Sequence, residues 1–135
     1  MRIVVDTNVI LDIFLKREPF FSASYAALRK AAEADADCFI SAAAATDIFY
    51  ILRKNLKSSE QAKAYLSSLM QLVSFSDVLS TDIAEALASE MADFEDAVVD
   101  AVASRMGAQC ILTRNTKDFV KAKTKAVTPE EYTKL

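Results

Sequence analysis

The chain has 135 residues, of which 53% are hydrophobic and 26% charged, and its formal net charge is −3. This length fits one ordinary domain with a full apolar core, and no apolar run is long enough to predict a transmembrane helix. Histidine is absent and glycine occurs once, which excludes a zinc site built on histidine, a histidine general base and a glycine-rich phosphate loop. No signal-type stretch precedes the first predicted strand, so we expect a cytoplasmic protein without a membrane partner.

The first predicted elements bring a carboxylate to the end of a strand. An apolar run over residues 3–5 predicts a buried strand, Asp6 follows it directly, and a helix is expected over residues 8–15. Because ligands of parallel sheets bind at the carboxyl ends of the strands, Asp6 is a candidate binding residue. Its alternative role is to cap the helix that follows.

The next elements carry a second candidate. A helix over residues 20–33 and a strand over residues 38–40 lead to Ser41, which is expected to cap a helix over residues 42–56. Asp47 is predicted to lie about two turns into this helix, in a strongly apolar stretch. Burying an unpaired charge costs free energy. The Asp47 carboxylate is therefore expected to contact a metal ion, an arginine or solvent.

The rest of the chain continues the alternation of strands and helices. We expect a helix after Ser58 to about residue 69, a short apolar run over 72–75, helices after Thr81 and from Asp93, a strand over 110–113, an edge strand over 125–127 and a final helix from residue 129. Cys38 and Cys110 each open an apolar run and are expected to be free core residues. This pattern predicts a single α/β domain, residues 1–135, built as a three-layer α/β/α sandwich with a mainly parallel central sheet.

Acidic and basic residues are segregated along the chain. No lysine or arginine occurs between residues 64 and 104, where eight acidic residues fall. Three of these, Asp93, Asp96 and Asp100, are spaced three and four residues apart and should share one helix face. The helix dipole favours acids such as Asp93 and Glu95 at a helix start. Carboxylate clusters without histidine or cysteine suit Mg²⁺ or Mn²⁺, although an ordinary solvated surface also explains the charge pattern.

Four segments in this order are similar to a known family. Over nearly the whole chain, the sequence resembles PIN-domain proteins in four motifs: I-V-V-D-T-N-V, T-D-I-F-Y-I-L, D-F-E-D-A-V-V-D-A-V-A and I-L-T-R-N-T-K-D-F. The resemblance implies a metal-dependent ribonuclease with sheet order 3-2-1-4-5. Many small members are VapC-type toxins, which a cognate antitoxin inhibits and which are often dimeric.

The resemblance also assigns roles to individual residues. Asp6, Asp47 and Asp96 match the first three acidic ligands of a Mg²⁺ or Mn²⁺ ion, with Asp47 where glutamate is common. Asn115 stands where an aspartate is usual, so either Asn115 or Asp118 completes the site. The residues expected around these ligands are Asn8, Asp93, Asp100 and Thr113, and those expected to contact the RNA backbone are Arg114 and Lys117.

The main hypothesis is therefore a Mg²⁺- or Mn²⁺-dependent endoribonuclease with an RNA substrate, an antitoxin partner and a homodimeric state. One alternative, motivated by Asn115 and by the short side chain of Asp47, is a catalytically weak PIN-like module that binds RNA or protein. Another is a phosphatase of the haloacid-dehalogenase type, which also places an aspartate after its first strand. That family expects a second aspartate where this chain has Asn8.

Overall fold

The computed structural model describes all residues, 1–135. Its five strands form one parallel sheet in the order β3-β2-β1-β4-β5, which confirms the predicted order 3-2-1-4-5. The strands are β1 (Arg2–Val5), β2 (Asp37–Ser41), β3 (Ser74–Ser76), β4 (Cys110–Leu112) and β5 (Ala126–Val127). The central strand β1 and its neighbour β4 are therefore paired, and their carboxyl ends meet at one edge of the sheet.

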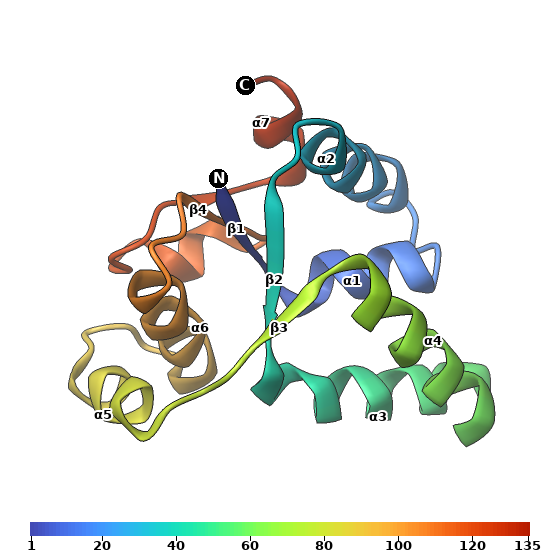
Figure 1. Cartoon of the computed structure of the whole chain (residues 1–135), viewed down its shortest axis with the longest axis horizontal. Coiled ribbons are helices and arrows are strands. Elements are labelled where there is room, and N and C mark those ends of the chain that lie inside the picture. The colour runs from blue at the N-terminus through green and yellow to red at the C-terminus, as the bar shows by residue number, and fades with distance from the viewer.

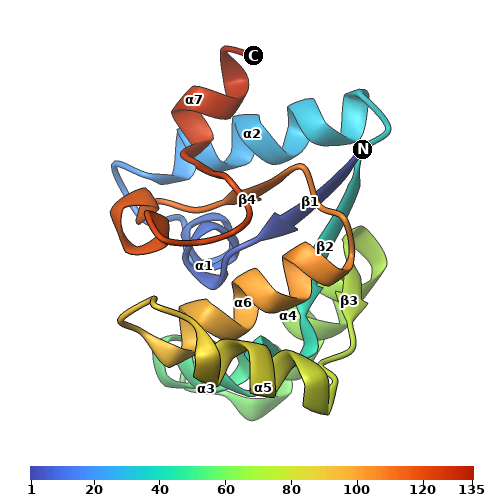
Figure 2. The ribbon, with the colours of Figure 1, turned by 90° about the vertical axis from the view of Figure 1, so that its left-hand side faces the viewer.

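Helices cover both faces of the sheet and complete the predicted three layers (Figure 1). One face carries α1 (Thr7–Phe14), α2 (Phe21–Glu33), α3 (Ala45–Leu56), α4 (Ser59–Leu72) and α7 (Pro129–Thr133). The other face carries α5 (Ser80–Ala88) and α6 (Phe94–Arg105), which pack side by side (Figure 2). Short 3₁₀ turns cover Ala42–Ala44 and Thr116–Phe119. None of the helices combines the length and the apolar character needed to cross a bilayer.

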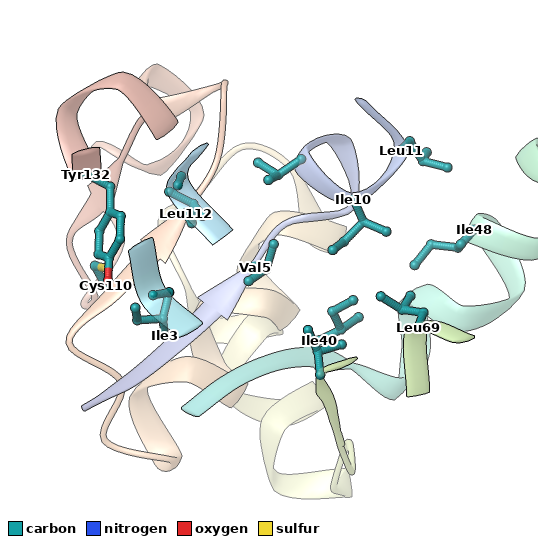
Figure 3. Close-up of a cluster of buried hydrophobic side chains, with 14 of the residues drawn as sticks. Ile3, Val5, Ile10, Leu11, Ile40, Ile48, Leu69, Cys110, Leu112 and Tyr132 are labelled. Atoms are coloured by element: carbon teal, nitrogen blue, oxygen red, sulfur yellow. The ribbon is translucent and has the colours of Figure 1, made fainter. Parts of the chain in front are cut away.

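Alternate side chains of the central strands build two separate cores. Ile3 and Val5 pack among the helices α1 to α4, where Ile10 and Ile40 join them (Figure 3). Val4, between them in the sequence, faces the opposite way and packs in the core beneath α6. Burial of such a side chain contributes roughly 1.5–3 kcal/mol, so the register of β1 is fixed by apolar residues on both faces.

Local signals place most helix ends where the sequence predicts them. The Ser58 hydroxyl accepts a hydrogen bond from the Gln61 amide at 3.1 Å and so caps α4. Gly107 lies just beyond α6 with φ +68°, a backbone conformation that favours glycine. The helix expected after Thr81 instead begins at Ser80 and ends at Ala88, because the Asp82 carboxylate accepts a hydrogen bond from the Leu79 amide and fixes an earlier start.

Both cysteines are free, as predicted. Cys110 is buried, Cys38 is half-buried, and both pack against the larger core. Burial raises the pKa of each thiol, which keeps them in the neutral form expected of core residues.

Candidate active site

The carboxyl ends of β1 and β4 hold two polar side chains next to each other. The Asp6 amide donates to the Leu112 carbonyl at 2.9 Å, which continues the pairing of the two strands. The fully buried Thr113 then donates its hydroxyl to Asp6 Oδ2 at 2.8 Å. The sequence-based expectation that these two strand ends are neighbours is confirmed.

Asp6 is held from three directions. Its Oδ1 accepts a hydrogen bond from the Thr7 amide at 2.8 Å, so Asp6 is the N-cap of α1, the alternative role that its place in the sequence suggests. The Asn8 side chain lies beside it, as expected, with Nδ2 3.3 Å from Asp6 Oδ2. Burial raises the pKa of Asp6, while the hydrogen bonds from Thr113 and Thr7 oppose the shift. The carboxylate is thus fixed in direction before any ligand arrives.

A cavity of about 310 Å³ opens beside Asp6. Four acidic side chains from three elements line it: Asp6 after β1, Asp47 on α3, and Glu95 and Asp96 on α6. Thr7 and Ser41 add hydroxyl groups at the ends of β1 and β2, and the remaining wall is apolar. The structure therefore brings Asp6, Asp47 and Asp96, three of the candidate residues from the sequence, to one cavity.

The predicted position of Asp47 within its helix is wrong, and of the alternatives for its surroundings the structure shows exposure to solvent. Residues 42–44 form a 3₁₀ turn, so α3 begins at Ala45 and Asp47 lies in its first turn. Its side chain is exposed at the cavity, because Ile48 and Leu52 form the buried face of the helix. Asp47 therefore needs no buried partner to offset its charge.

Glu95 is the cavity residue that the sequence analysis did not single out. Burial raises its pKa, and the charge and hydrogen bond of Asp47 raise it further. The helix dipole gives a sufficient reason for an acid at this position, which concealed its second role. The sequence did contain a signal for Glu95, because it directly precedes Asp96 at the start of a helix. Side chains at these two positions can both extend toward the same cavity.

The pKa of Asp96 is raised to about 7, first by burial and then by the charges of Asp93, Asp6, Asp118 and Glu95. Asp93 caps α6 by accepting the Asp96 amide at 2.9 Å. Asp93 and Asp118 line an adjacent hollow instead of the cavity itself. Their charges nevertheless reach Asp96, so the acidic cluster extends beyond the four residues of the cavity wall.

Asp100 does not belong to this cluster, contrary to the expectation from its spacing. It is buried, and its carboxylate accepts the backbone amides of Lys123 and Thr124, each at 2.9 Å. Helical periodicity places Asp100 near the face of Asp96, but backbone amides of the loop that precedes β5 donate hydrogen bonds to its carboxylate oxygens. Asp100 therefore holds this loop and not a ligand of the cavity.

Arg114 also forms an ion pair with another residue of the protein. Its Nε and Nη2 donate to both oxygens of the fully buried Asp12, the latter at 3.2 Å, and its guanidinium stacks on Phe20 at 3.9 Å. This pairing directs the Arg114 guanidinium toward Asp12, which also lies 4.0 Å from Arg17. Lys117 is exposed beside Asp118.

Asn115 lies outside the cavity wall and is exposed. Its backbone amide donates to Thr113 Oγ1 at 3.1 Å, so it supports the hydroxyl that orients Asp6. Asp118 influences the site through its charge, which raises the pKa of both Asp6 and Asp96. Of the two candidates for the fourth position, Asp118 has the stronger electrostatic link to the cavity.

The donor set suits a hard divalent cation. All candidate ligands are oxygens, which Mg²⁺ and Mn²⁺ prefer. The pKa of Asp96 is raised by burial and by neighbouring negative charges, and a cation would offset these charges. In the structure the carboxylates surround the cavity without three of them meeting where one ion could be held. The residues fit such an ion by their chemistry, and they line one cavity.

Comparisons with known proteins agree with this architecture. The family model of the PIN domain matches residues 2–117. No curated protein matches the sequence.

Solved structures with the same fold include VapBC2 from Rickettsia felis bound to promoter DNA (TM-score 0.77, 17% identity, 95% of this chain and 98% of that chain). A toxin–antitoxin complex from Klebsiella pneumoniae has a TM-score of 0.66 at 25% identity, with 95% and 98% covered. VapC20 of Mycobacterium tuberculosis, described as a toxin that cleaves the sarcin–ricin loop, has a TM-score of 0.62 at 15% identity, with 81% and 86% covered. The family match leaves the haloacid-dehalogenase alternative without support. With a family model over most of its length and the predicted sheet order, this chain belongs to the PIN domain family.

Proposed function

We propose that this protein is a Mg²⁺- or Mn²⁺-dependent endoribonuclease and the toxin of a toxin–antitoxin pair. The observation that carries the proposal is one cavity lined by the carboxylates of Asp6, after β1, and of residues on α3 and α6. Asp6, Asp47 and Asp96 would hold the ion, with Asp118 or Asn115 at the fourth position. When bound, such an ion polarises a phosphodiester and lowers the pKa of a water molecule.

The protein's own residues prepare this site by fixing Asp6. Thr113 and Thr7 each donate a 2.8 Å hydrogen bond to a different oxygen of its carboxylate. Thr113 is in turn held by the Asn115 amide. Because the ligand direction is set in advance, little conformational freedom has to be lost when an ion and a substrate bind.

Support for an RNA substrate and a protein partner comes from proteins with the same fold. VapC20 is described as cleaving the sarcin–ricin loop, and the Klebsiella pneumoniae structure is a toxin–antitoxin complex. We extend these properties to this chain as part of the proposal: RNA is the substrate, an antitoxin protein inhibits it, and it acts as a homodimer in the cytoplasm.

RNA cleavage by purified wild-type protein and by Asp6→Asn tests this function. The wild type is expected to cut RNA internally, and Asp6→Asn is expected to lose cleavage while keeping its circular dichroism spectrum. Asp37→Asn is the matched control, since Asp37 is exposed at the amino end of β2, on the opposite edge of the sheet. Undiminished cleavage by Asp6→Asn would refute the proposed site.

A catalytically weak module that binds RNA or protein is the second candidate. It is favoured by Asn115, which supplies no charge and lies outside the cavity wall. Calorimetric titration of Mn²⁺ separates the two functions. The nuclease is expected to bind Mn²⁺ and to lose binding in Asp6→Asn, whereas a protein that binds no Mn²⁺ but retains RNA binding would favour the module.

A further inference from the structure

A second hollow lies at the corner between α3 and α4, away from the acidic cavity. It has a volume of about 460 Å³ and is lined by Tyr50, Arg53, Lys54, Lys57, Ser58 and Ser59. Three cationic side chains thus surround one space, and Tyr50 beside them is 60% exposed. Figure 1 shows α3 and α4 side by side, joined at this corner.

These cations have no partner within the protein. All five ion pairs of the structure involve other residues, and Arg53, Lys54 and Lys57 are exposed. Their position differs from that of Arg114, whose guanidinium is paired with the buried Asp12. The corner is therefore a place where the protein offers clustered positive charge to a ligand.

The start of α4 adds donors for an anion. Ser58 caps the helix and uses its hydroxyl for the Gln61 amide and its carbonyl for the Ala62 amide. The first amides of this 14-residue helix make no bond within the helix, and a helix N-terminus favours phosphate groups. Glu60 is an acid in the same first turn but does not line the hollow.

One face of α3 connects this hollow to the acidic cavity. Asp47, Tyr50 and Lys54 follow one another at spacings of three and four residues, which places them along one side of α3, and Lys57 directly follows the helix as its C-cap. At about 1.5 Å per residue, Lys54 lies roughly 10 Å along the axis from Asp47. The opposite side, with Ile48 and Leu52, is buried. A linear ligand lying on this face would touch the cations at one end and the carboxylates at the other.

We propose that this corner binds single-stranded RNA, with backbone phosphates at Arg53, Lys54 and Lys57 and an unpaired base stacked on Tyr50, and that the strand runs along α3 to the acidic cavity. The path of the strand along α3 to the acidic cavity rests on the proposed nuclease function. Phosphate contacts supply affinity that depends on salt. An exposed aromatic ring supplies stacking that does not depend on base identity.

Fluorescence anisotropy of a labelled, unstructured RNA at several KCl concentrations tests the site. Asp6→Asn serves as the parent, because it is expected to leave the RNA intact. Replacing Arg53, Lys54 and Lys57 by glutamine should make the negative slope of log affinity against log salt less steep by about 2, since each cation contributes about 0.7 with single strands. Tyr50→Leu should weaken binding on the order of tenfold without changing the slope.

The matched control removes the same net charge elsewhere, through glutamine at the exposed residues Lys16, Lys125 and Lys134. It is expected to alter the slope much less than the corner variant. An equal reduction of the salt dependence in both triple variants, or no RNA binding by the parent, would overturn the inference. An unchanged affinity of Tyr50→Leu would overturn the stacking contact. Because cleavage is measured separately on the wild type, an inactive wild type that still binds RNA at the corner would refute the nuclease and leave the site supported.

Discussion

The crowding of carboxylates around Asp96 predicts that removing its charge stabilises the metal-free protein. Burial and neighbouring charges raise the pKa of Asp96 from its ordinary value of 3.8 to about 7. The folded chain therefore incurs a cost for ionising Asp96 that the unfolded chain does not. This cost is absent below pH 3.8, grows as the pH rises and is complete above pH 7.

The magnitude follows from the difference between the two pKa values. A difference of about three corresponds to about 4 kcal/mol, which is an upper value because Asp96 remains partly exposed and water screens the charges around it. We expect Asp96→Asn to raise the free energy of unfolding by about 1–2 kcal/mol at a pH near 8 in a chelator. Near pH 4 the variant and the wild type should differ little, because most of the cost is then absent.

Urea denaturation followed by circular dichroism measures this difference at both pH values, with Asp37→Asn as the control. Saturating Mn²⁺ should reverse the order, because a ligand at one hundred times its Kd stabilises the wild type by about 2.7 kcal/mol and binds the variant less well. A chelated Asp96→Asn protein that is less stable than the wild type at both pH values would refute the reasoning. Ionised Asp96 would then make favourable contacts in the absence of metal.

Two further substitutions test the surroundings of the site and the packing of α5 on α6. Thr113→Val removes the hydroxyl that donates to Asp6, so we expect a loss of about 1–3 kcal/mol in unfolding free energy and slower RNA cleavage, both recovered in Thr113→Ser. Wild-type behaviour of the valine variant would contradict this. Arg105 holds the pKa of Asp82 below its usual range through hydrogen bonds of 2.9 and 3.0 Å. The stability from this pair is present above the usual pKa of an aspartate and is lost as the pH falls through the lowered one. In urea denaturation, Arg105→Leu should therefore destabilise the protein more at pH 7 than near pH 2, and an equal loss at both would show that the charge pair contributes nothing.

Sequence reasoning succeeded where the cause of a structure is local. An apolar run followed by Asp6 and a serine before α4 each depend on a few neighbouring residues, and both lie where predicted. The order of the sheet was obtained from the family motifs, because strand pairing between distant segments leaves no local pattern.

The errors arose where a distant partner decides the role of a side chain. The spacing of Asp100 suggests a shared face with Asp96, but two amides more than 20 residues away bind its carboxylate. The partner of Arg114 is Asp12, separated by 102 residues. Glu95 was overlooked for the opposite reason, because a local explanation, the helix dipole, already accounted for it.

The dependence of RNA cleavage on divalent metal tests the central claim most directly. Wild-type protein, freed of metal with a chelator, is incubated with end-labelled RNA before and after addition of Mn²⁺, alongside Asp96→Asn and Asp37→Asn. We predict no cleavage in the chelator, recovery with Mn²⁺ in the wild type and in Asp37→Asn, and no recovery in Asp96→Asn. Cleavage that continues in the chelator, or that Asp96→Asn supports as well as the wild type, would contradict the assignment of this acidic cavity as a metal-dependent nuclease site.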